Sequence, residues 1–168
     1  MTALQLVDIK DFMNKLLGSD LFDHFLLPEA TITTFSTYHI DGHLNSDFFS
    51  PEDEQYDLIQ QTAISPFSLL RPICFQLIKG NRTPLSFKFV FQLSPENQRR
   101  TIEKSGCSFQ PEDITGMFLN LRFQNQQLTC TTGISYRTFS MDKSLEQEWD
   151  RLIQVFLKNH KIPFEVIA

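Results

Sequence analysis

The sequence predicts one α+β domain over residues 1–168, in which helices cover a largely antiparallel sheet. Segments that alternate apolar and polar residues, as half-buried strands do, are interleaved with segments whose apolar residues follow helical spacing. A length of 168 residues with 41% hydrophobic content suits a single hydrophobic core. Because the chain has 17 Phe residues, against one Trp and three Tyr, we expect that core to be largely aromatic.

The first part of the chain is predicted to form a strand, a helix and a hairpin. Residues 3–7 are expected to form a short strand. After it, Asp8 can cap a helix that Gly18 ends. The helical spacing lies in these apolar residues: Ile9, Phe12, Met13, Leu16 and Leu17. Asp41-Gly42 is the kind of dipeptide that type I′ turns prefer, so we expect a hairpin turn there and a return strand near 43–49.

Residues 50–84 are predicted to connect this part to the next. The acidic stretch that opens at Ser50 has the chemistry of a helix start, and it forms either a short helix or a loop. The pattern over 66–79 fits a helix ended by Gly80 better than a strand. Pro72 would disrupt the interior of such a helix unless the helix begins there.

The second part of the chain repeats strand, helix and hairpin and then adds a helix. Alternation is strongest over 85–93, which predicts a half-buried strand. A polar helix capped after Ser94 and ended by Gly106 follows, and then come further strands with hairpin spacing. The C-terminal helix, over 144–160, carries one apolar stripe: Leu145, Trp149, Leu152, Ile153, Phe156 and Leu157.

Two parts of the chain, about 3–49 and 85–140, therefore share one order of elements. This order resembles the half-domain that is repeated in DNA sliding clamps, and the resemblance implies a clamp-like fold with the C-terminal helix as an addition. The sequence departs from that pattern in its charges. Clamp inner helices resemble one another in being basic, whereas both corresponding helices here carry acidic and basic residues.

The whole chain also resembles a family of short bacterial proteins of unknown function. The resemblance rests on four runs of sequence: FDHFLLPEATITTF, CFQLIKG, FQLSPEN and LTCTTG. It implies a bacterial setting and implies no activity.

Composition and charge exclude several functional classes. A net charge of -5 and a pI near 5.3 disfavour indiscriminate binding to nucleic acid or anionic lipid. The chain shows no apolar run of membrane-spanning length and no signal-peptide pattern, so we expect a cytoplasmic protein without membrane contact. Its three cysteines form no CxxC pair, which predicts reduced thiols rather than disulfides or a zinc site: Cys74, Cys107 and Cys130.

One group of residues is a candidate metal site. His39, Asp41 and His43 stand at alternate positions, so on a continuous strand they would share one face and, with Asp47, could bind a metal ion. A hairpin turn at Asp41-Gly42 would instead point the two histidines to opposite sides of the sheet. The hairpin is the favoured interpretation.

Two further sets of residues are candidates for binding. Basic residues that could contact nucleic acid or another anion are scattered along the chain: Lys79, Arg82, Lys88, Arg99, Arg100, Arg122 and Arg137. Lys88, Arg122 and Arg137 would form a patch only if strand register places them on one face. On the C-terminal helix, Trp149 and Phe156 could dock a partner, although burial against the domain's own sheet is the favoured explanation of the stripe.

The leading functional hypothesis is a non-enzymatic binding or assembly module of clamp-like fold, acting on a protein partner or on a second copy. The sequence holds no GxSxG, Cys-His or HExxH pattern, and no motif that predicts a cofactor. One alternative is a small metal-dependent hydrolase that uses His39, Asp41 and His43. Another is a weak nucleic-acid-binding protein.

Overall fold

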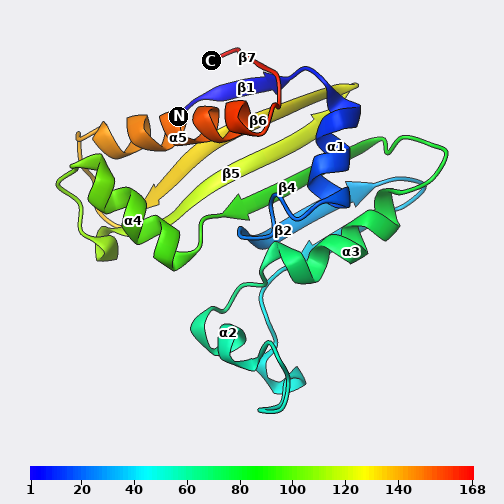
Figure 1. The fold of residues 1–168 in the computed structure, drawn as a ribbon, viewed down its shortest axis with the longest axis horizontal. Helices are drawn as coiled ribbons and strands as arrows, with labels where there is room; N and C mark the ends of the chain where they lie inside the picture. The colour runs from blue at the N-terminus through cyan, green and yellow to red at the C-terminus, as the bar shows by residue number, and fades with distance from the viewer.

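The computed structural model describes all residues 1–168 apart from the side chain of Leu58. In the part of the chain so described, seven strands form one antiparallel sheet in the order β3-β2-β4-β5-β6-β1-β7 (Figure 1). Their bounds are β1 (Ala3–Leu6), β2 (Leu26–Thr33), β3 (Thr37–Asp41), β4 (Ser86–Gln92), β5 (Ile114–Gln124), β6 (Gln127–Tyr136) and β7 (Phe164–Val166). The predicted class, helices with a largely antiparallel sheet, is confirmed.

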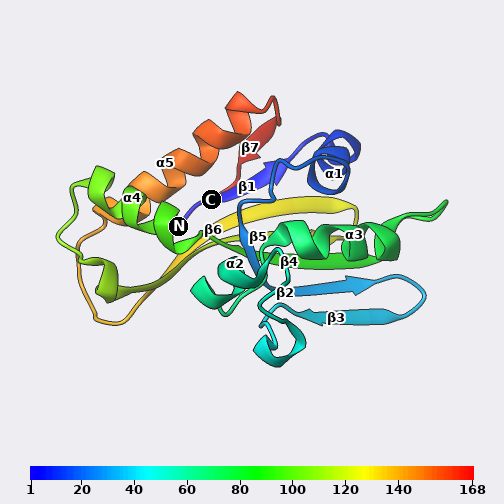
Figure 2. The same cartoon turned by 60° about the horizontal axis from the view of Figure 1, so that its bottom comes forward.

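Helices cover one face of this sheet and leave the other open (Figures 1 and 2). The covering helices are α1 (Ile9–Gly18), α3 (Phe67–Ile78), α4 (Pro95–Ser105) and α5 (Ser144–Asn159). Helix α2 (Tyr56–Gln61) and the short 3₁₀ helix η1 (Ser46–Phe48) lie between β3 and α3 in the chain and do not cover the sheet (Figure 1). A second 3₁₀ helix, η2 (Pro111–Asp113), precedes β5. Among the described residues, no helix combines the length and the apolar character that crossing a membrane requires.

The helix ends follow the local chemistry that the sequence predicts. The Asp8 carboxylate accepts a hydrogen bond from the backbone N–H of Asp11 at 3.0 Å, and Ser94 caps α4 in the same way. Gly106 ends α4 with φ of 68°, a left-handed conformation that glycine adopts without strain. Most of the segment 66–79 is helical, as predicted, since α3 covers Phe67–Ile78. The expectation for Pro72 is wrong, because the helix begins before this residue and continues through it.

The core between helices and sheet is aromatic, as predicted. Phe22 stacks on Phe91 with ring centroids 5.4 Å apart, and Phe67 meets Phe91 edge-on at 5.0 Å. The fully buried Phe side chains are Phe12, Phe22, Phe67, Phe89 and Phe91. Alternation along β4 produces this arrangement, because every second residue of the strand faces the helices.

The predicted hairpin turn at Asp41-Gly42 is wrong. Strand β3 itself is the return strand, and the turn lies at 34–36, where the Thr34 N–H donates to the Ser36 carbonyl at 2.8 Å. Gly42 instead lies where the chain leaves the sheet and crosses β2. A Cβ atom on Gly42 would stand 1.7 Å from the carbonyl oxygen of Leu27, so the glycine allows a close backbone crossing rather than a turn.

The two predicted repeats share an order of elements but not a pattern of strand pairing. The orders β1-α1-β2-β3 and β4-α4-β5-β6 both occur. Strand β4, however, pairs with β5, the next strand of its own unit, whereas β1 pairs with β6 and β7 and is not a neighbour of β2. A two-fold relation between equivalent halves would require matching pairs, so the sheet does not reproduce the predicted repeat.

Residues 43–64 form an extension that we call the arm, and the rest of the chain is the body. The arm leaves the sheet after β3, contains η1 and α2, and projects away from the body (Figures 1 and 2). Its root is a pair of antiparallel segments bridged at His43 and Ile64, in which the Leu44 N–H donates to the Ala63 carbonyl at 2.8 Å and the Ser65 N–H to the Gly42 carbonyl at 2.7 Å. The acidic stretch that opens at Ser50, for which a short helix or a loop is predicted, lies within this arm and leads into α2.

Candidate functional site

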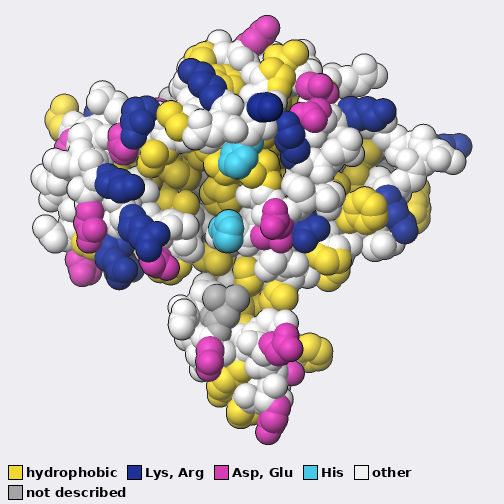
Figure 3. All heavy atoms as spheres, in the orientation of Figure 1, with side chains coloured by type: hydrophobic (Ala, Val, Ile, Leu, Met, Phe, Trp, Pro, Cys, Tyr) yellow, Lys and Arg dark blue, Asp and Glu magenta, His cyan; other side chains and the backbone are white. Residues whose placement is uncertain are grey.

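An apolar groove opens on the helix-covered side of the body, between α4, α5 and the loop from α1 to β2. Its volume is about 480 Å³. The apolar lining comes from all three walls: Leu21 and Phe25 from the loop, Leu93 before α4, and Leu152, Val155 and Phe156 from α5. Figure 3 shows this hollow as a gathering of hydrophobic side chains in the middle of the view.

Helix α5 contributes more apolar side chains to the groove than either other wall does, because its apolar stripe is wider than the face that packs on the sheet. The buried residues Leu145, Trp149, Ile153 and Leu157 face the sheet. Phe156, the residue before Leu157, is only half-buried, and its ring packs edge-on against that of Phe22 with centroids 5.5 Å apart. Val155 stands at the groove edge with 38% exposure. The helix therefore presents a second apolar strip to the groove.

The two residues predicted to dock a partner, Trp149 and Phe156, lie in different surroundings. Trp149 is 3% exposed, and its indole N–H donates to the carbonyl of Phe118 on β5 at 3.0 Å. Its side chain is therefore anchored in the packed core, and only its small exposed part lines the floor of the groove. Phe156 lies in the groove wall, where a bound molecule can reach it.

The rim of the groove is basic. Arg100 and Lys104 line it from α4, and His24 lines it from the loop. None of the described lining residues is Asp or Glu. The Arg100 guanidinium contacts the Glu96 carboxylate at 2.6 Å, but both side chains are more than half exposed, so this pair neutralises the rim only weakly. Figure 3 shows several Lys and Arg side chains over α4 beside the hollow, with Asp and Glu side chains among them.

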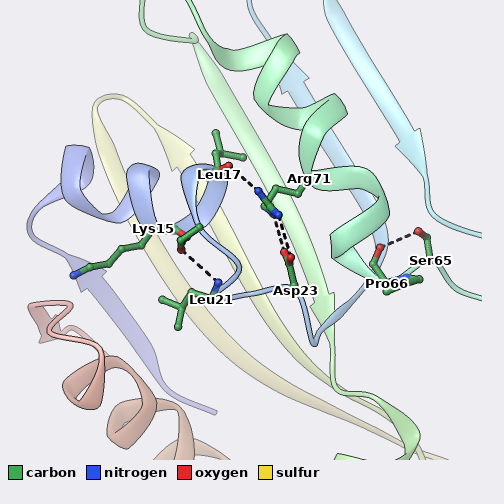
Figure 4. A network of polar contacts seen from close by, with 8 residues as sticks. Lys15, Leu17, Leu21, Asp23, Ser65, Pro66 and Arg71 are labelled. Atoms are coloured by element: carbon green, nitrogen blue, oxygen red, sulfur yellow. Dashed lines mark hydrogen bonds and ion pairs between the residues drawn. The ribbon is translucent and has the colours of Figure 1, made fainter. Parts of the chain in front are cut away.

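An ion pair in the body holds the loop wall in place (Figure 4). The Arg71 side chain, on α3, donates from Nε and Nη2 to the two carboxylate oxygens of Asp23 at 2.8 and 3.1 Å. The same guanidinium donates to the Leu17 carbonyl at 3.4 Å. Because Asp23 lies between Leu21 and Phe25, this two-pronged contact positions the apolar residues that the loop contributes to the groove.

The open face of the sheet carries a second candidate surface. Strand register places polar residues in a row across the sheet: His39, Thr31, Lys88, Arg122, Thr129, Gln5 and Glu165. Lys88 stands directly opposite Arg122, a like-charge pairing that costs roughly 0.2–1 kcal/mol in an antiparallel sheet. A shallow depression of about 770 Å³ lies over these two residues, with Glu29 at its side.

The other basic residues lie in other places. Lys79 and Arg82 lie in the loop between α3 and β4, where both line one hollow, and Arg137 follows β6. Arg99 and Arg100 belong to α4, on the helix-covered side of the sheet and thus across it from Lys88. The structure therefore distributes the seven candidate anion contacts over several surfaces, and only Lys88 and Arg122 are direct neighbours in the sheet.

The candidate metal residues are only partly brought together. The ring Nδ1 of His43 lies 2.7 Å from the Asp41 carboxylate, and hydrogen bonds from the His43 backbone and ring lower the pKa of Asp41 below its ordinary value. The ring of His39 instead contacts the Thr31 hydroxyl at 3.2 Å, and Asp47 lies in the arm. Among the described residues, no group of three His, Cys, Asp or Glu side chains is placed to hold a metal ion.

Of the three cysteine thiols, two are buried and one is half-buried. Burial raises the pKa of Cys74 and of Cys130 to about 12, so both remain protonated at neutral pH. Cys107, just after Gly106, is half-buried with its Sγ 3.8 Å from the Ile102 carbonyl. These environments favour structural thiols.

The groove as a whole has no local signature in the sequence, because its walls come from segments far apart in the chain, near residues 21–25, 93–104 and 149–159. One signal was present. The apolar stripe of α5 spans more positions than one packed face needs, since Leu152, Val155 and Phe156 lie beside the buried residues. A stripe of that width indicates either a second packing partner or an open surface.

A protein-family model described as a family of unknown function (DUF5721) matches residues 15–165. The matched range includes both the groove and the arm. No curated protein and no solved structure matches the chain.

Proposed function

The chain belongs to the DUF5721 family of unknown function, and we propose that it is a non-enzymatic binding module whose groove receives an acidic peptide segment with apolar side chains. The observation that carries this proposal is the composition of the groove. An apolar floor is bordered by the cationic side chains of Arg100 and Lys104, with no carboxylate among the described lining residues.

This composition matches the physical requirements of peptide recognition. An apolar side chain that leaves water for the groove contributes roughly 25 cal/mol for each Å² of apolar surface buried. An amphipathic segment can present several such side chains to one groove, while its polar side remains in water. Cations at the rim then favour an anionic segment by raising its association rate and by repelling basic competitors.

The groove chemistry also favours binding over catalysis. Within the described lining, His24 is the one side chain of the type most often used in acid–base catalysis. Acid–base catalysis needs a positioned proton donor or acceptor together with groups that orient the substrate. The other lining residues of the His24 loop are the apolar Leu21 and Phe25, which suit contact with an apolar side chain.

A labelled peptide tests the proposal. We would use a fluorescent peptide with a Phe-Phe pair flanked by Glu residues and measure its fluorescence anisotropy. The protein would carry Phe48→Ser, so that the exposed aromatic side chain of the arm does not compete with the peptide for the groove. We expect saturable binding, abolished by Val155→Glu at the groove edge and weakened about tenfold by Lys104→Glu at the rim.

The matched control is Lys10→Glu, which makes the same charge change on an exposed residue of α1 outside the groove. It should leave the affinity unchanged, and a peptide with Lys in place of Glu should bind more weakly. Equal affinities for the Val155→Glu, Lys104→Glu and Lys10→Glu chains would exclude the groove as the binding site.

A second candidate function is binding of a phosphate-bearing polymer on the open face of the sheet. The direct opposition of Lys88 and Arg122 supports it, because an anion between the two would relieve their repulsion. The test is the salt dependence of affinity for a single-stranded oligonucleotide. Lys88→Gln with Arg122→Gln should reduce both the affinity and the salt slope, whereas Arg137→Gln should change neither. Salt-independent binding would contradict this candidate.

A further inference from the structure

We infer that the segment received by the groove belongs to the arm of a second copy of this chain, so that the protein self-associates when the arm of one copy (residues 43–64) docks over the groove of another and places Phe48 in it. This inference rests on the proposed function of the groove. Three observations support it: an exposed aromatic side chain on the arm, opposite charge on arm and groove, and the direction in which the arm projects.

The arm exposes an aromatic side chain that its own fold does not cover. Phe48 is 85% exposed, and its ring meets that of Phe49 edge-on at 5.5 Å. Ile59 on α2 is buried, so the arm has a small anchor of its own while Phe48 remains outside. Such a side chain is an apolar contact available to another surface, and aromatic residues are enriched at the centre of protein interfaces.

The charges of the arm and the groove are complementary. The arm holds no Lys or Arg and these acidic residues: Asp47, Glu52, Asp53, Glu54 and Asp57. Removing these five from the chain's 20 Asp and Glu residues leaves 15, equal to its 15 Lys and Arg residues, so the whole formal charge of -5 resides in the arm. Figure 3 shows acidic side chains on the arm and basic ones beside the groove.

The arm is directed away from the groove of its own copy. Its root is held at the edge of β2, where the Gly42 N–H donates to the Pro28 carbonyl at 2.9 Å. From there the arm extends away from α4 and α5 (Figure 1). Its own groove would be reached only by bending this hydrogen-bonded root, whereas the groove of a neighbouring copy can be reached without rearrangement.

The size of the arm suits a stable contact. Residues 43–64 are 22 residues, a number within the roughly 20–30 that each partner contributes to an interface of standard size. Because the arm and the groove are different surfaces, copies joined in this way form a reciprocal pair, a closed ring or an open filament. The contact is the same in each case, and the native mass distinguishes them.

Complementary variants test the inference by light scattering on a sizing column. Phe48→Ser removes the aromatic contact of the arm, and the double variant Lys104→Glu/Val155→Glu blocks the groove. We expect the unmodified chain to be oligomeric and each variant alone to behave as a monomer of 19.6 kDa. Mixed together, the two should form a 1:1 complex of twice that mass, because an intact arm then meets an intact groove. The loss of Phe48 should weaken self-association by about 30-fold or more.

The control is Phe35→Ser, at the turn between β2 and β3. Phe35 is 94% exposed and meets Tyr38 edge-on, much as Phe48 meets Phe49. Its replacement should leave the oligomer intact, which separates a specific contact from a general loss of surface hydrophobicity.

Failure of the inference is distinguishable from failure of the proposed function. A monomeric unmodified chain that binds the acidic peptide as tightly as the Phe48→Ser chain would overturn the inference and leave the proposed function standing. An oligomer that persists in both variants would overturn the inference, because another surface would then join the copies. A monomeric chain that binds no peptide would overturn both.

Discussion

The body and the arm use the same residue type in opposite ways. In the body, Phe91 is fully buried and packs against the rings of Phe22, Phe25, Phe67 and Phe89. In the arm, Phe48 has one aromatic neighbour and is 85% exposed. Acidic and basic residues balance in the body, while the arm is acidic throughout. The difference shows that aromatic burial stabilises the body, whereas the exposed ring in the arm adds little to its stability and remains available for the contact that we propose.

The largest expected effect compares these two Phe environments directly. Phe91→Ala should lower the free energy of unfolding by about 3–5 kcal/mol, because it leaves a cavity among several packed rings. Phe48→Ala should change it by less than about 0.5 kcal/mol. Urea denaturation would measure both, with each change made in the Lys104→Glu/Val155→Glu chain so that self-association does not contribute. Similar losses for the two variants would contradict the distinction between body and arm.

The next prediction concerns the junction between the two regions. Gly42→Ala would place a Cβ atom 1.7 Å from the Leu27 carbonyl oxygen, so β2 and the arm root must separate. We expect a loss of about 1–3 kcal/mol in thermal or urea unfolding. Gly133→Ala on β6 is the control, because a Cβ there meets nothing within 4 Å. If both variants were equally stable, the close crossing at Gly42 would not be a structural requirement.

A third prediction concerns the ion pair that holds the groove wall. Asp23→Asn keeps the shape of the side chain but removes the charge that Arg71 contacts, and it should cost roughly 1–3 kcal/mol of stability and weaken peptide binding. Glu96→Gln removes the exposed partner of Arg100 and should cost at most about 0.5 kcal/mol. Denaturation and anisotropy together would check this, and an Asp23→Asn chain with unchanged affinity would show that the loop needs no such anchor.

The smallest expected effect is a dependence of body stability on acid. Hydrogen bonds from Ser144 and Ser108 hold the pKa of Asp142 well below its ordinary value of 3.8. Since the folded pKa is depressed, this contribution to stability is present above about pH 4 and is lost as pH falls further toward the folded pKa. Asp142→Asn should flatten the stability–pH curve below pH 4, and Ser108→Ala should flatten it in part. An unchanged slope in Asp142→Asn would assign the acid dependence to other groups.

Several parts of the fold were predictable because their causes are local. Caps at Asp8 and Ser94, the stop at Gly106 and the alternation along β4 depend on interactions within a few residues, and the structure shows each where the sequence indicates it. Asp41-Gly42 shows the limit of such signals. The same dipeptide serves a tight turn or a close backbone crossing, and the choice depends on Leu27, which is distant in sequence.

The sequence by itself therefore determined the class of the fold, the places of most helices and strands, the aromatic character of the core and the concentration of negative charge in residues 43–64. Only the tertiary structure decided the register that sets Lys88 opposite Arg122, the direction of the arm, and the groove that Phe156 and Lys104 share. The physical reason is the range of the interactions. Periodicity and capping act within a few residues, whereas register and groove walls bring together segments that are tens to more than a hundred residues apart.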